Sequence, residues 1–191
     1  HNRKEGKILH RDLKPGNIFL DATNNVKLGD FGLSRIMGEE STFASTHVGT
    51  PYYMSPEQIN ESRYNEKSDI WSAGCLLYEM SGLRPPFEAK NHMALAMKIK
   101  AGKIERLPSR YSEELQRVVL WMLTVNSNKR PSVEDLLNIP QISLRLREKK
   151  LRDTHVSLKK REEEAKSREK DLLEKEKSIQ GKEEDINRQE E

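Results

Sequence analysis

The feature that most restricts what this chain can fold into is a set of polar residues with fixed spacing near its start. Asp12 precedes Asn17 by five positions, and the tripeptide Asp30-Phe31-Gly32 begins thirteen residues after Asn17. In this spacing the first carboxylate can act as a base beside an attacking hydroxyl group, while the amide and the second carboxylate supply oxygen ligands for magnesium. The pattern therefore predicts a catalytic loop with a metal site beside it.

The residues after this first motif predict two strands, a long loop and then helices. Apolar and β-branched residues at 17–20 and 26–29 flank an Asn-rich turn, as in a pair of strands. Residues 30–57 lack periodicity and are rich in Ser, Thr and Gly, which predicts a long functional loop. Helices are expected after three N-terminal caps, namely Ser68-Asp69, Ser112 and Pro131-Ser132.

Residues 7–140 resemble the C-terminal lobe of a eukaryotic serine/threonine protein kinase, and within that family they are similar to the NIMA-related subfamily. The resemblance rests on the polar set above and on two further segments, Gly49-Thr50-Pro51-Tyr52-Tyr53-Met54-Ser55-Pro56-Glu57 and Tyr64-Asn65-Glu66-Lys67-Ser68-Asp69-Ile70-Trp71-Ser72. It implies a mainly α fold, with the kinase C-terminal lobe at residues 1–143.

The sequence contains neither a G-x-G-x-x-G-x-V segment nor a V-A-I-K-like strand. In the family these segments cover the ATP phosphates and supply the lysine that pairs with a helix glutamate. We therefore expect a chain without the N-terminal lobe, either a fragment or a truncated gene model.

The resemblance implies that the enzyme uses ATP and Mg²⁺, and it assigns roles to five residues. Asp12 orients or accepts the proton of the substrate hydroxyl group, and Lys14 lies beside the γ-phosphate, as in kinases specific for Ser and Thr. Asn17 and Asp30 hold magnesium. Phe19 is implied to form the floor of the adenine pocket, although the sequence alone equally supports a core phenylalanine.

Other residues are implied to support this site. His10 and Phe31 resemble members of the kinase hydrophobic spine, and Asp69 resembles the central-helix residue that hydrogen-bonds the catalytic loop. Glu57 resembles the glutamate that pairs with an arginine near the end of the lobe, for which Arg130 is the candidate. A buried pair of this kind is costly to break from one side.

Arg11 stands where the phosphate of an activation loop is received in the family. The available acceptors are Ser41, Thr42, Ser45 and Thr46. Thr46 matches the activating position best, and a phosphate there can order the loop through an arginine contact. The alternative is a merely solvated Ser/Thr loop. Thr50 is expected to hydrogen-bond Asp12 and Lys14.

The tail at residues 144–191 has a different composition, with 29 charged side chains in the 47 positions of 145–191 and no Trp, Tyr, Phe or Pro. Apolar residues recur at every seventh position: Leu144, Leu151, Leu158, Ala165, Leu172, Ile179 and Ile186. Charged residues such as Arg161 and Glu162 stand four and three positions before each later member, so each heptad has one apolar layer. We expect a coiled-coil homodimer; the alternative is a solvated single helix or disordered charged segment, which Gly181 favours.

The composition bears on which classes of partner and which cellular compartment we expect. The net charge of +3 comes from interleaved basic and acidic residues, so the sequence does not predict nucleic-acid binding. We expect no membrane association, because no apolar run reaches the length of a membrane span. The single cysteine, Cys75, excludes an intrachain disulfide and fits a reducing compartment. The resemblance implies the cytoplasm, nucleus and centrosome.

Two functions remain at this stage. The first is an enzyme, a Ser/Thr kinase that acts on protein substrates, with a mitotic or centrosomal role by resemblance. The alternative is a catalytically inactive fragment that acts as a dimerising coiled-coil interaction module. Coding sequence upstream of His1 for the Gly-rich loop and strand lysine would separate them.

Overall fold

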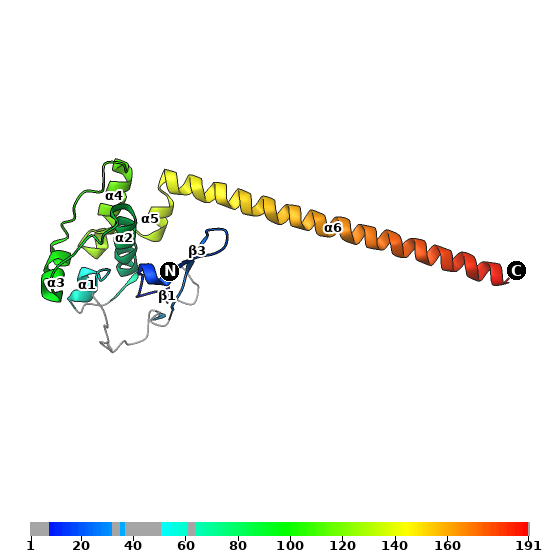
Figure 1. Cartoon of the computed structure of the whole chain (residues 1–191), viewed down its shortest axis with the longest axis horizontal. Helices are drawn as coiled ribbons and strands as arrows, with labels where there is room; N and C mark the ends of the chain where they lie inside the picture. Colours follow the sequence, from blue (N-terminus) through cyan, green and yellow to red (C-terminus); the bar gives the residue numbers. More distant parts are fainter. Residues whose placement is uncertain (1–7, 32–34, 37–50, 61–63, 191) are drawn as a thin grey trace. The chain divides into compact units, whose positions relative to one another are not determined.

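A computed structural model of the protein describes residues 8–31, 35–36, 51–60 and 64–190 (Figure 1). The chain divides into two compact units, His1–Leu136 and Leu137–Glu191. Helices account for most of the described residues, and the mainly α fold expected from the sequence is confirmed.

The predicted pair of strands is present as β2 (Ile18–Leu20) and β3 (Val26–Leu28), which pair antiparallel. The Asp21 side chain closes the turn between them, because its Oδ1 accepts the backbone N–H groups of Thr23 and Asn25, each at 2.9 Å. Turn residues of this type satisfy their own backbone. The hairpin follows directly on a short 3₁₀ helix, η1 (Pro15–Asn17).

The long segment at 30–57 is not loop throughout. β4 (Arg35–Ile36) lies within it and pairs antiparallel with β1 (Ile8–Leu9), so the expectation of an uninterrupted loop was wrong. A two-residue strand is too short to produce a periodic pattern in the sequence. The segment ends at α1 (Pro56–Ile59), which Ser55 caps.

The remaining helices of the first unit are α2 (Glu66–Gly82), α3 (His92–Ala101), α4 (Glu113–Met122), η2 (Ser127–Lys129) and α5 (Val133–Leu137). Two predicted caps are confirmed. Ser112 Oγ accepts the backbone N–H of Leu115 at 3.3 Å, and Ser132 Oγ accepts that of Asp135 at 3.1 Å. Each bond satisfies a backbone donor that the first helical turn leaves unpaired.

The start of α2 differs from the prediction. Its N-cap is Asn65, whose side chain accepts the Lys67 backbone N–H at 2.9 Å, and not the pair Ser68-Asp69. Ser68 is the third helical residue, and its Oγ accepts the Asn65 backbone N–H at 3.4 Å while it donates to Glu57 at 2.7 Å. Asp69 accepts two backbone N–H groups of another segment. The helix therefore begins one turn earlier.

The sequence analysis did not identify α3, although its boundaries carry ordinary signals. Asn91 caps the start by accepting the Ala94 N–H at 2.8 Å, and Gly102 ends the helix with φ +64°. Lys98 and Lys100 lie in the last turn, where cations are favoured. Its mixed pattern of Met, Ala, Leu and Lys obscured the helical period.

The core of the first unit gathers around α2. The side chains fully or almost fully buried in it are Trp71, Cys75, Tyr78, Phe87, Leu95, Ile99, Leu107, Val119 and Leu123. Trp71 stacks on Phe87, with ring centroids 5.6 Å apart. These buried side chains thus join α2, α3 and α4 in one core.

Gly74 allows α2 and α4 to approach closely, and we predict that Gly74→Ala destabilises the protein. A Cβ at this position would lie 2.9 Å from Met122 Cβ and 3.1 Å from Leu123 Cδ2. We expect a net loss of about 1–2 kcal/mol, although alanine favours a helix by about 1 kcal/mol over glycine. Gly82→Ala is the control, because its Cβ would meet nothing nearer than 3.7 Å. Chemical denaturation of both variants checks the difference; equal stabilities would contradict it.

The second unit is dominated by α6 (Pro140–Glu190), a single helix of 51 residues. Its apolar residues at heptad positions are largely exposed, from 56% for Ile179 to 71% for Leu151. Ion pairs run along the helix, including Lys166 with Glu162 at 2.7 Å. None of the helices that the structure describes has a stretch long and apolar enough to span a membrane.

Candidate functional site

The loop before β2 brings three predicted residues together. Asp12 Oδ2 accepts a hydrogen bond from Lys14 Nζ at 2.7 Å and another from Asn17 Nδ2 at 3.0 Å. Asn17 Nδ2 also donates to the Asp12 backbone oxygen at 2.8 Å. The 3₁₀ turn at Pro15–Asn17 makes this possible, because it folds the amide back onto the carboxylate. A carboxylate, an ammonium group and an amide thus share one small site.

The buried carboxylate of Asp69, on α2, forms hydrogen bonds with the backbone of this loop. It accepts the backbone N–H of His10 at 2.9 Å and that of Arg11 at 3.0 Å. Arg11 has φ +72°, a left-handed conformation that disfavours side chains by roughly 1–2 kcal/mol. The two charge-assisted hydrogen bonds offset this strain. The strained backbone therefore stands one residue before Asp12, where it sets the direction of the next side chain.

His10 connects the Asp12 loop to the second motif. Its Nδ1 accepts the Asp12 backbone N–H at 3.3 Å, which leaves Nε2 to donate to the Gly29 carbonyl at 3.0 Å. Its ring also meets Phe31 edge-on, with centroids 5.0 Å apart. Asp30 lies between these two contacts and is itself left-handed, with φ +54°. The imidazole thus fixes the segments that carry Asp12 and Asp30 relative to each other.

Phe19 and Phe31 are both surface residues in the described structure, 56% and 55% exposed. Phe19 is therefore not a core phenylalanine here. Its ring covers Gly29 so closely that a Cβ there would lie 2.6 Å from Phe19 Cε2. Leu20 and Val26 are also exposed, at 63% and 66%. The β2–β3 hairpin thus presents apolar surface beside the Asp12 loop.

The donor atoms fit magnesium better than a softer metal. The amide nitrogen of Asn17 donates hydrogen bonds to Asp12, so the amide oxygen is the atom left to bind a cation. Asp30 adds a carboxylate. Within the described residues no cluster of three or more His, Cys, Asp or Glu could hold a metal by itself. Magnesium suits such a sparse oxygen site, since it keeps several waters and takes further oxygens from substrate phosphates.

Glu57 and Arg130 form a bidentate ion pair. Arg130 donates from Nη1 and Nη2 to the two Glu57 carboxylate oxygens, each at 2.7 Å. Its other donors bind the backbone oxygens of Thr124, Val125 and Lys67. The guanidinium carbon lies 4.8 Å from the Trp71 ring centroid. Every donor of this buried guanidinium is therefore used.

Tyr64 is a supporting residue that sequence reasoning missed. Its hydroxyl donates to Asp69 Oδ1, and the Arg11 guanidinium carbon lies 5.6 Å from its ring centroid. Burial and the negative charge of Asp69 raise the pKa of Tyr64 well above its usual range, so it remains a donor. A tyrosine five residues before Asp69 gives no sequence signal for this contact.

The segment Pro51–Ser55 is fastened to α2 on the same side of the core. Ser72 Oγ donates to the Tyr53 backbone oxygen at 2.8 Å, and the Tyr53 hydroxyl donates to Glu79 at 2.6 Å. Burial and the Glu79 carboxylate raise the pKa of Tyr53 above its usual range. The predicted acceptors Ser41, Thr42, Ser45 and Thr46, and the predicted contact residue Thr50, lie outside the described residues.

Comparison with known proteins gives a consistent result. Residues 1–142 match the family described as protein kinase domain. The chain is 57% identical over 145 residues to "Serine/threonine-protein kinase Nek2" of Homo sapiens, covering 75% of this chain and 33% of that protein. It is 54% identical over 163 residues to "Probable serine/threonine-protein kinase nek2" of Dictyostelium discoideum, covering 85% and 39%. It is 51% identical over 156 residues to "G2-specific protein kinase nimA" of Emericella nidulans, covering 82% and 22%. The chain thus spans about two fifths or less of the length of these relatives.

Proposed function

This chain belongs to the protein kinase family, among the NIMA-related serine/threonine kinases, and on that premise we propose that the full-length protein transfers the γ-phosphoryl group of ATP to serine and threonine hydroxyl groups of proteins. The observation that carries the proposal is the contact of Asp12 with both Lys14 and Asn17. A base, a cation and an oxygen ligand at one point are the parts that phosphoryl transfer requires.

Each residue has a separate task in this reaction. Asp12 receives or orients the proton of the substrate hydroxyl group while the hydroxyl oxygen forms a bond to the γ-phosphorus. The bond from that phosphorus to the bridging oxygen breaks, and ADP leaves. Lys14 balances negative charge on the transferring group, and Asn17 and Asp30 hold magnesium. Magnesium held there would supply positive charge that offsets the negative charge of the phosphate groups.

The test is transfer of label from γ-labelled ATP, with Mg²⁺, by the full-length protein to a peptide that contains Ser, Thr and Tyr. We expect label on Ser and Thr. Label on Tyr alone, or label that does not depend on the protein, contradicts the proposal.

Because one relative is named as G2-specific, we also propose a cell-cycle role at the centrosome, in the cytoplasm and in the nucleus. Imaging of the tagged protein through the cell cycle tests this proposal.

A second proposal concerns α6, which we infer pairs with a second copy as a parallel coiled coil. The exposed column of Leu144, Leu151, Leu158, Leu172 and Ile179 supports it, because one seven-residue apolar seam lies along a single helix. Pairing would bring one Thr46 near the neighbouring active site at millimolar effective concentration, on the order that short linkers give. The protein would then phosphorylate its own loop in trans.

We predict that this dimer is weak and sensitive to salt, since charged positions adjoin a single apolar layer in each heptad. Sedimentation of the full-length protein should show dissociation as ionic strength rises. Leu172→Asp should weaken pairing at least tenfold and make Thr46 phosphorylation depend on protein concentration. Leu173→Asp is the matched control, because Leu173 is 52% exposed but off the seam. A monomer at low salt, or equal effects of the two variants, would mean that α6 acts as a solvated helix.

A further inference from the structure

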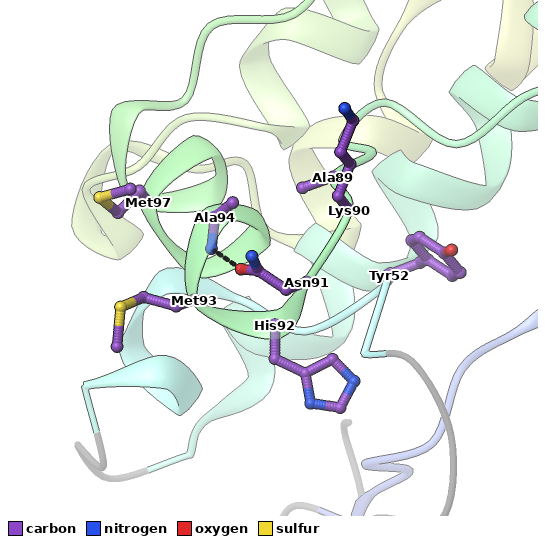
Figure 2. Close-up of a pocket in the computed structure, with 8 residues that line it drawn as sticks. All are labelled: Tyr52, Ala89, Lys90, Asn91, His92, Met93, Ala94 and Met97. Atoms are coloured by element: carbon purple, nitrogen blue, oxygen red, sulfur yellow. Dashed lines mark hydrogen bonds between the residues drawn. The ribbon is translucent and has the colours of Figure 1, made fainter.

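α3 carries apolar side chains on two sides. Leu95 and Ile99 are buried, 1% and 0% exposed, and pack into the core. Met93 and Met97 lie one turn apart and are 77% and 63% exposed, and Figure 2 shows both projecting from the same side of the helix. The outward side of a surface helix is normally polar. Two adjacent exposed methionines, whose flexible side chains adapt to many shapes, therefore indicate a contact surface.

A hollow of about 830 Å³ surrounds the first turn of α3. Its lining includes Tyr52, Lys90, His92, Met93, Ala94 and Met97 (Figure 2). A volume of this size can accept one or two large side chains. The hollow is open at the surface and has sulfur, aromatic and ammonium groups on its walls, so it suits an extended peptide better than a small polar molecule.

Lys90 is the one lysine, arginine or acidic residue among the described residues that line the hollow. Lys90 lines it and Lys100 lies three residues beyond Met97 on α3, and among the described residues neither lysine forms an ion pair. The neighbouring acid Glu105 is already paired with Arg84. At the start of α3 the backbone N–H of Ala94 already donates to the Asn91 side chain. The two lysines are therefore the groups left to attract acidic residues on a partner.

The hollow is connected to the candidate catalytic loop through hydrogen bonds to α2. Tyr52 adjoins Tyr53, which is bonded to Ser72 and Glu79 of α2. The same helix carries Asp69, which holds the loop that contains Asp12. A polypeptide bound in the hollow would thus be positioned relative to Asp12 through α2.

We propose that this hollow docks a segment of the protein substrate that is separate from the phosphorylated residue and carries a large apolar side chain between acidic residues. The inference rests on the proposed kinase function and adds a determinant of substrate choice. The apolar side chain lies against Met93 and Met97, and the acidic residues face Lys90 and Lys100. Burial of one such side chain corresponds to roughly a tenfold gain in binding or more.

Direct binding tests the surface without catalysis. The probe is a fluorescein-labelled peptide with Phe and Leu between Asp and Glu residues, and fluorescence anisotropy measures its affinity for the full-length protein. We expect Met97→Asp and Lys90→Glu each to weaken binding about tenfold, since the first removes apolar contact and the second reverses a charge. Met80→Asp and Lys103→Glu are matched controls, because both residues are exposed and outside the hollow. Equal binding by Met97→Asp and Met80→Asp would overturn the proposal.

Kinetics distinguish docking from the kinase proposal itself. The substrates are a short peptide with an acceptor serine and the same peptide joined to the acidic-apolar segment. We expect the joined segment to lower KM about tenfold in the wild type and to lose this advantage in Met97→Asp, with kcat unchanged for the short peptide. No transfer to either peptide contradicts the proposed function. Transfer with the advantage intact in Met97→Asp refutes docking alone, and tighter binding of a peptide from α6 than of the probe would overturn the assignment to substrate.

Discussion

Replacement of Asp12 by asparagine should reduce kcat for protein phosphorylation by about 100- to 10,000-fold in the full-length protein, the range expected for loss of a positioned base. The substitution keeps the shape of the side chain and an oxygen that can still accept from Lys14 and Asn17. What it removes is the negative charge that receives or orients the hydroxyl proton. KM for ATP should change little, because Asp12 is not assigned to nucleotide binding.

Steady-state transfer of labelled phosphate measures this effect, with circular dichroism to show that the variant is folded. Asp153→Asn is the control, since it makes the same chemical change on the exposed surface of α6. Asp30→Ala should also abolish turnover, because it removes a proposed magnesium ligand. Added Mg²⁺ should restore little activity to this variant. A rate near that of the wild type in Asp12→Asn would overturn its assignment as the base.

Removal of Arg130 should have the largest effect on stability. In Arg130→Met the Glu57 carboxylate remains partly buried, and among the described residues Ser68 is its remaining side-chain donor. The cost is roughly 3–5 kcal/mol. The double variant Glu57→Gln/Arg130→Met should be less destabilised than the single one, because no charge is left without its partner. Urea denaturation measures all three proteins. A double variant less stable than Arg130→Met would show that the pair's charges are not the source of the effect.

The same pair gives the protein a dependence on acid. Burial tends to raise the pKa of Glu57, but hydrogen bonds from Arg130 and Ser68 outweigh it and hold the pKa below the ordinary value of 4.5. A depressed pKa in the folded state means that the stabilisation is complete above the ordinary value and is lost as pH falls through the lower one. Wild-type stability should therefore decline below about pH 4.5. Glu57→Gln should show a smaller decline over the same interval.

The local part of the site was predictable from the sequence, and the distant part was not. The five-residue spacing of Asp12 and Asn17 determines their contact once a short 3₁₀ turn forms between them. The hydrogen bond from the His10 backbone N–H to Asp69, 59 residues away, could be expected only by resemblance to a known family, since no local pattern encodes it. Tyr64 was missed for the same reason.

Secondary structure shows the same division. The caps at Ser112 and Ser132 were read correctly because each acts within one turn of its own helix. The N-cap of α2 was misplaced at Ser68, which is the third helical residue and whose hydroxyl group also donates to Glu57, a contact that local sequence does not reveal. The docking hollow also escaped notice, since the apolar residues of α3 face both the core and the outside.

α2 forms hydrogen bonds both to the loop that contains Asp12 and to the segment Pro51–Ser55, so one helix positions both. Their spacing is then independent of how the chain travels between them. Sequence and length in the connections could drift over evolutionary time without altering the distance that a bound substrate must bridge. Variation among relatives should accordingly concentrate in those connections, while the face of α2 bearing Asp69, Ser72 and Glu79 stays constant.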